Sequence, residues 1–119
     1  MHEQRERQRL NWAQLFTRYD VLLCPAVVTA AIPHDASEPV HLRRITVNGQ
    51  PRDYLDQLDW AGLIGAPGLP ATVAPVGRTA GGLPVGLQIV GPWLEDRTPL
   101  TFAALLAELT GGFAAPPGF

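Results

Sequence analysis

The chain has 119 residues and a net charge of -2, with 46% hydrophobic and 17% charged residues. This length suits a single domain, and this composition is that of a folded chain rather than a disordered one. The small negative charge provides no field that attracts a phosphate backbone or an anionic membrane surface, so we expect neither nucleic acid nor a membrane as a partner.

The cysteine count and the distribution of apolar residues exclude several kinds of site and location. Cys24 is the single cysteine, which excludes an internal disulfide and the cysteine pair of a structural zinc site. The first nine residues are charged and polar, and no later stretch approaches the ~18 apolar residues of a membrane helix. We therefore expect a cytoplasmic protein without metal or cofactor.

The first half of the chain predicts a helix, a strand and a small hairpin. Apolar residues recur at helical spacing between residues 12 and 19, which predicts an amphipathic helix. No capping residue precedes it, as in a helix cut from a longer one. Residues 21–23 predict a buried strand that ends at Pro25, where the backbone donor is lost. After a stretch without periodicity, residues 45–47 run into Asn48-Gly49, a dipeptide typical of a hairpin turn.

The second half predicts a helix, two strands and a closing helix. Residues 54–63 return to helical spacing before a loop rich in glycine and proline. Residues 71–76 and 85–90 predict two central, mostly buried strands around a Gly81-Gly82 turn, because both are apolar and rich in β-branched side chains. Gly62, Gly65 and Gly68 lie three apart just before the first of these strands, a spacing that suits close approach of the backbone to another helix or to a ligand.

The closing helix is predicted to start with Thr98 as N-cap and Pro99 as first helical residue. It ends at Gly111-Gly112 and is nearly apolar on most sides. Such a helix needs cover on more than one face, and this chain has few elements to provide it. We therefore expect a large exposed apolar patch.

Three motifs occur in a fixed order. They are residues 19–25 (YDVLLCP), 68–77 (GLPATVAPVG) and 82–92 (GLPVGLQIVGP), followed by Glu95-Asp96-Arg97-Thr98 and an Ala/Leu-rich helix. In sequence, order and spacing they resemble the last part of amidase-signature enzymes, over nearly the whole chain and most specifically from Trp60 to Leu109. The resemblance implies an α/β fold: the C-terminal portion of a mixed β-sheet flanked by helices, incomplete as a single chain and covering residues 1–119.

The resemblance also implies a chemistry that this chain does not itself contain. Amidase-signature enzymes hydrolyse carboxamides with a serine nucleophile, activated by a second serine and a buried lysine. Here Ser37 is the single serine, without Gly-Ser-Ser surroundings, and lysine is absent, so no activating base of that kind is available. None of the family's catalytic residues maps onto this sequence, and we expect the chain to be inactive alone.

The family's C-terminal segment also forms one wall of the substrate pocket. By position, the candidates for substrate-binding residues are Asp59, Trp60 and Gly65. For Trp60 a core position over the sheet is an equal alternative, and Asp59 in a helix is more often solvated.

Two other constellations have residue types found in active sites. Cys24 with His34 and Asp35 has the residue types of a thiol hydrolase, but Pro25 lacks the N–H that would serve an oxyanion hole and a cysteine after an apolar strand is usually buried. The acidic and histidine residues of the loop at 34–41 match no metal-site spacing, so a solvated loop is favoured.

The sequence thus predicts the C-terminal part of an amidase, which meets a small-molecule amide substrate in the context of the full enzyme. Two alternatives stay open. One is an interaction module that docks with a separately encoded N-terminal amidase portion, or with itself as a homo-oligomer. The other is a truncated reading frame without function.

Overall fold

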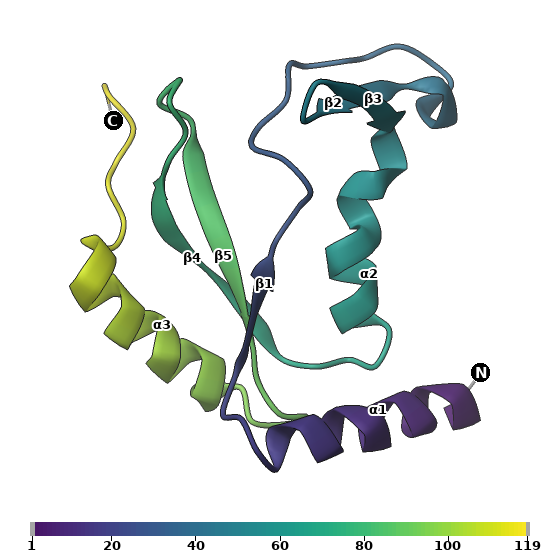
Figure 1. The fold of residues 1–119 in the computed structure, drawn as a ribbon, viewed down its shortest axis with the longest axis vertical. Coiled ribbons are helices and arrows are strands. Elements are labelled where there is room, and N and C mark those ends of the chain that lie inside the picture. Colours follow the sequence, from purple (N-terminus) through teal and green to yellow (C-terminus); the bar gives the residue numbers. More distant parts are fainter. Residues whose placement is uncertain (1, 119) are drawn as a thin grey trace.

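The computed structural model describes residues 2–118. In chain order the elements are α1 (His2–Phe16), β1 (Leu22–Pro25), the 3-10 helix η1 (Val40–Leu42), β2 (Arg44–Val47), β3 (Gln50–Asp53), the 3-10 helix η2 (Tyr54–Leu58), α2 (Asp59–Gly65), β4 (Ala71–Arg78), β5 (Pro84–Val90) and α3 (Arg97–Thr110). Figure 1 shows the β4–β5 hairpin near the middle, with α2 on one side, α3 on the other and α1 across one end. No helix within residues 2–118 is long and apolar enough to cross a membrane.

The main sheet has three strands in the order β1-β5-β4, and both strand pairs are antiparallel. Val90 of β5 is flanked by Leu22 of β1 and Ala71 of β4, which fixes the register at one end. An irregularity in the ladder lies between Pro75 and Gly77, where proline removes a backbone donor. Helices flanking a sheet confirm the predicted α/β class.

One face of this sheet carries the hydrophobic core. Cys24, Ile64, Leu69 and Val90 are buried together, and Trp12, Phe16, Leu22 and Trp60 pack against them. Side chains alternate across a strand, so this face of β5 bears Val90 while the opposite face bears Ile89. Full burial of a side chain such as Ile64 or Val90 contributes about 1.5–3 kcal/mol. The cluster therefore joins α1, α2 and the sheet.

The opposite face of the sheet is covered by α3. This helix packs against β4 and β5, and the Thr110 hydroxyl donates a hydrogen bond to the carbonyl of Pro75 at 3.2 Å. At its start, buried Pro99 lies against Gly91: a Cβ added to Gly91 would meet the Pro99 Cδ at 2.6 Å. Glycine is thus required at position 91 by space rather than by backbone angle.

The predicted hairpin near residue 48 is confirmed as a two-stranded sheet of β2 and β3. Asn48 and Gly49 both have positive φ, 51° and 76°, which is the conformation that this dipeptide tolerates. Arg43 holds the preceding loop: its guanidinium donates to the Ser37 carbonyl and to the Glu38 carboxylate.

Three expectations about strands are corrected. Within residues 2–118, β4 lies at an edge of the sheet rather than centrally, and its residues are mostly exposed or half-buried. In β5 only the C-terminal half is buried, because the hairpin tip extends beyond the helices (Figure 1). The first strand ends at Pro25 as predicted, but it is not a buried strand, because it lies at the other edge of the described sheet and only Cys24 of its residues is buried.

The helix boundaries also differ from the pattern. The closing helix α3 begins at Arg97, and the Thr98 hydroxyl donates to the Glu95 carboxylate instead of capping the helix. Residues before it already turn, with the Thr98 N–H bonded to the Glu95 carbonyl at 3.0 Å. The helical pattern over 54–63 divides into η2 and α2. In α1, only the last turns reach the core through Trp12 and Phe16.

Candidate functional site

The three residues predicted to bind substrate all lie on α2, the short helix that leads into the glycine-rich loop. The helix ends in a tight turn, with the Gly68 N–H bonded to the Gly65 carbonyl at 3.0 Å and the Leu69 N–H to the Ile64 carbonyl at 3.2 Å. Gly68 has a φ of 75°, a conformation that favours glycine. This turn connects α2 to β4.

The structure does not bring the three candidates to one face of α2. Trp60 is half-buried and packs against the core cluster, on the same side as buried Ile64. Asp59 and Gly65 are exposed, and no ion pair of the described chain involves Asp59. Trp60 therefore anchors the helix, while Asp59 and Gly65 lie on its solvent side.

The glycines of α2 have free space around them. A Cβ added to Gly62 or Gly65 would meet no atom within 4 Å, and neither residue has positive φ. Glycine inside a helix costs about 0.5–1 kcal/mol relative to alanine. No contact within residues 2–118 explains that cost, so packing inside this chain is not the reason for these two glycines.

Arg9 of α1 holds the loop that follows α2, although no local sequence pattern predicts this contact. Its Nε donates to the Pro67 carbonyl at 2.7 Å and its Nη1 to the Glu6 carboxylate at 2.7 Å. The guanidinium also lies over the ring of Trp93, 4.2 Å from the centroid. One side chain thus links α1 to two loops that are distant in sequence.

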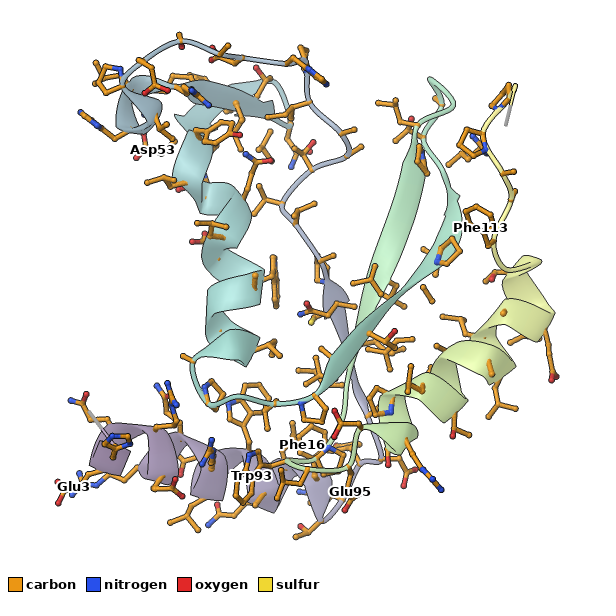
Figure 2. All side chains as sticks on the ribbon, turned by 180° about the vertical axis from the view of Figure 1, so that it is seen from behind. Glu3, Phe16, Asp53, Trp93, Glu95 and Phe113 are labelled. Carbon is orange, nitrogen blue, oxygen red and sulfur yellow. The ribbon has the colours of Figure 1, made fainter. Side chains whose placement is uncertain are left out.

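A groove of about 410 Å³ runs beside this arginine. It is lined mainly by apolar side chains, with carboxylates at its rim: Glu6, Arg9, Leu10, Ala13, Phe16, Thr17, Leu69, Pro92, Trp93 and Glu95. Figure 2 shows the labelled side chains of Phe16, Trp93 and Glu95 gathered where α1 meets the loop before α3. The groove contains no nucleophile with a base, so its lining offers binding surface rather than hydrolytic chemistry.

The cysteine considered as a nucleophile is part of the core. Cys24 is 4% exposed, and the Nε2 of Gln88 donates to its Sγ at 3.3 Å. Gln88 is itself buried and faces Cys24 directly across the β1–β5 ladder. A buried thiol beside a neutral amide lacks the electropositive, accessible surroundings of a reactive thiolate. Cys24 is a small core residue.

The loop with the remaining polar candidates is solvated. The Ser37 N–H donates to the Asp35 carboxylate at 2.9 Å, and hydrogen bonding from Ser37, with a smaller effect of the Arg43 charge, lowers the pKa of Asp35 below its ordinary value. A carboxylate that accepts a serine's hydrogen bonds orders the loop, and it does not supply the strong base that a serine nucleophile needs. In the part of the chain that the structure describes, no three His, Cys, Asp or Glu residues form a group that could hold a metal ion.

Comparison with known proteins matches this chain to amidases. The family model described as Amidase matches residues 1–100. The chain is 42% identical over 57 residues to fatty-acid amide hydrolase 2-A of Danio rerio, covering 48% of this chain and 11% of that protein. It is 31% identical over 104 residues to a glutamyl-tRNA(Gln) amidotransferase subunit of Archaeoglobus fulgidus, covering 85% of this chain and 20% of that subunit.

Solved structures show the same fold. The crystal structure of an amidase superposes with a TM-score of 0.73 at 24% identity, over 90% of this chain and 23% of the other. A bacterial aryl acylamidase of the amidase signature family gives a TM-score of 0.59 at 21% identity, over 93% of this chain and 24% of the other. The chain therefore spans between 11% and 24% of the length of these relatives.

Proposed function

Since this chain belongs to the amidase family, we propose that it is the C-terminal part of an enzyme that hydrolyses carboxamide C–N bonds. In this proposal it provides sheet scaffold and one wall of the substrate pocket. The observation that carries the proposal is the family match over residues 1–100, together with a chain that spans 20% of a matched amidotransferase subunit.

The catalytic groups come from sequence outside this segment. Amide hydrolysis by a serine requires an activating base within hydrogen-bond reach. This chain has one serine, Ser37, and no lysine, and Ser37 lies exposed in a loop beside a carboxylate of lowered pKa. The scaffold role therefore fits these residues, and the nucleophile role does not.

For the pocket wall we propose the solvent side of α2, with Asp59, Trp60 and Gly65 in different roles. The exposed Asp59 carboxylate is available to accept a hydrogen bond from a substrate amide N–H. Gly65, with free space at its Cβ position, lets a substrate approach the backbone. Trp60, held by the core, fixes the orientation of the helix.

A transplant experiment tests this function. Residues of this chain replace the matched segment of the Archaeoglobus fulgidus protein, with which they align over 104 residues, and the activity of the hybrid is measured. We expect the hybrid to regain the activity that deletion of the segment abolishes, and Asp59→Asn to change KM more than kcat. A folded hybrid without activity would contradict the proposed scaffold role.

A second candidate function is an interaction module that docks with a separately encoded N-terminal amidase portion. The supporting observation is the exposed apolar surface: Leu100, Leu105 and Leu109 of α3 are 57%, 56% and 86% exposed. These leucines flank the exposed Thr101 and Glu108 of the same helix, and exposed apolar side chains rimmed by polar ones are typical of an interaction site. Co-expression of the two portions distinguishes the candidates, because a separate module assembles without a covalent link.

A further inference from the structure

The loop that joins α2 to β4, residues 66–70, is tied to the rest of the chain through its carbonyl groups. Two of its residues are prolines without a backbone N–H, and its three N–H groups bond back to carbonyls of α2. The Arg9 Nε donates to the Pro67 carbonyl at 2.7 Å, and the Gly91 N–H donates to the Pro70 carbonyl at 2.9 Å. The loop, which runs alongside α1 in Figure 1, is thus held by α1 at one point and by the residue after β5 at another.

Arg9 fills the space between α1 and the turn that ends α2. The side chain of Pro67 is fully buried, and a buried carbonyl that lost its hydrogen-bond donor would destabilise this arrangement. The Arg9 side chain is only 19% exposed. Its Nη2 lies beside Gly68, since a Cβ added to that glycine would meet this atom at 3.4 Å. The guanidinium is therefore an inner part of the junction rather than a surface charge.

The contacts of this side chain require a planar guanidinium. Its Nε donates to the loop, its Nη1 donates to the Glu6 carboxylate, and its face lies over the Trp93 ring at 4.2 Å from the centroid. Lysine has one compact, strongly hydrated ammonium group and cannot reproduce this combination of stacking and directed hydrogen bonds. Position 9 therefore requires arginine, and a positive charge alone does not satisfy it.

The end of α2 that Arg9 holds is also the part proposed to meet the substrate. The Gly65 carbonyl accepts the Gly68 N–H at 3.0 Å, so Gly65 belongs to the turn beside the arginine. Trp60 and Ile64 fix the inner side of the helix in the core, but Gly65 has no side chain that could anchor the helix end. The position of its backbone therefore depends on the turn, and the turn depends on Arg9.

We propose that Arg9 is a positioning residue for the substrate pocket: by holding the Pro67 carbonyl, it sets where the Gly65 backbone meets the bound amide. This inference rests on the proposed function, in which the solvent side of α2 forms one wall of the pocket. Arg9 does not touch the substrate. Since the wall contributes binding and the catalytic groups lie outside this segment, a displaced wall weakens substrate binding and leaves turnover of the bound substrate unchanged.

Amide hydrogen exchange in the 119-residue chain tests the first step, that Arg9 holds the turn. The Gly68 and Leu69 N–H groups close this turn, so we expect Arg9→Lys to speed their exchange at least tenfold. The amide of Ile89, fully buried in the middle strand of the described sheet, should exchange as in the wild-type chain. Unchanged exchange in the turn would overturn the proposal. So would equal acceleration at Ile89, because Arg9 would then support the whole fold rather than the turn.

A hybrid enzyme tests the second step, that the turn sets substrate binding. This whole chain replaces the segment of the bacterial aryl acylamidase that superposes on 93% of it, and an aryl acylamide is the probe substrate. We expect Arg9→Lys to raise KM about tenfold and to change kcat less than twofold. A merely structural role would lower the amount of active enzyme, and hence the apparent kcat, without moving KM.

Two control variants separate the loop contact from charge and from the ion pair. Arg7→Lys makes the same substitution at an exposed position of the same helix. Glu6→Gln removes the ion pair with Arg9 but keeps the hydrogen bond to the Pro67 carbonyl. Both variants should keep KM and the exchange of the turn within twofold of the wild-type values. A Glu6→Gln variant that matches Arg9→Lys would overturn the proposal in favour of the ion pair.

The hybrid also distinguishes failure of this inference from failure of the proposed function. A folded wild-type hybrid without activity would contradict the proposed function and the inference that rests on it. An active hybrid in which Arg9→Lys leaves KM unchanged, or lowers kcat alone, would overturn this inference and leave the proposed function standing.

Discussion

Single residues in this chain are constrained more by close contacts than by charge. Gly91 has no room for a side chain beside the buried ring of Pro99, and Arg9 joins α1 to two distant loops through one hydrogen bond, to Pro67, and one ring contact, with Trp93. Ion pairs at the surface, such as Arg52 with Asp56, are of the kind that contributes little to stability. The residues that matter most for the fold are therefore those at segment junctions.

Replacement of Gly91 by alanine should destabilise the chain. Its Cβ would lie 2.6 Å from the Pro99 Cδ and 3.2 Å from the Cγ, and overpacking of this kind costs about 1–3 kcal/mol. Urea unfolding followed by circular dichroism measures the loss. Because the clash is with the proline ring, Gly91→Ala should cost less in a Pro99→Ala background. Equal costs in both backgrounds would show that the contact is not the cause.

The carboxyl group of Asp35 should titrate below the ordinary aspartate value of about 3.9, because hydrogen bonds from Ser37 lower its pKa. A lowered pKa in the folded state stabilises the loop above the unfolded pKa, and this contribution is lost as the pH falls through the folded pKa. NMR titration of the Asp35 side chain measures it. Ser37→Ala should raise the pKa part of the way, since the backbone N–H still donates, and an unchanged pKa would contradict the assignment.

At the scale of elements, the helices differ in what their ends and faces require. α3 stops at Gly111, whose φ of 83° is that of a left-handed cap. α2 instead has glycine in its body at Gly62, with ordinary backbone angles and free space. Glycine is therefore required by its backbone conformation at the end of α3, whereas no conformation or contact within the described chain requires it in α2.

Two glycine-to-alanine substitutions should therefore change the free energy of unfolding in opposite directions. In the isolated chain, Gly62→Ala should raise the free energy of unfolding by about 0.5–1 kcal/mol through better helix propensity. Gly111→Ala should lower it by about 1 kcal/mol, because alanine is strained at positive φ. Thermal unfolding of both variants beside the wild-type chain is the measurement. A destabilising Gly62→Ala would mean that its backbone is not the ordinary helix seen here.

At the scale of the whole molecule, local patterns predict which elements exist, while their partners depend on contacts distant in sequence. The Asn48-Gly49 hairpin and the paired strands around Gly81-Gly82 follow from turn chemistry and β-branched content, and both are present. Sheet order is not a local property, so the apolar pattern of β4 predicts a central strand although β4 lies at an edge of the described sheet.

In the candidate site too, local patterns predict the element, while contacts distant in sequence decide how it is oriented. Helical spacing and the following glycine-rich stretch bring Asp59, Trp60 and Gly65 to one short helix, but which side faces the core depends on Cys24 and Val90 from other elements. The role of Arg9 is not predictable from the sequence, because its hydrogen bond to Pro67 spans 58 residues. Three leucines of α3 are exposed, as the composition of the helix predicts, but its outer side is not wholly apolar, because Arg97, Thr101 and Glu108 are exposed there too.

The central claim is that this segment provides scaffold for amide hydrolysis without the groups that perform it. Ammonia release from a panel of primary carboxamides, measured with the purified 119-residue chain, tests it most directly. We predict no release above the buffer rate, because Ser37 lacks a base and Cys24 is buried beside Gln88. Turnover by the purified chain that disappears in Ser37→Ala or Cys24→Ala would contradict the claim.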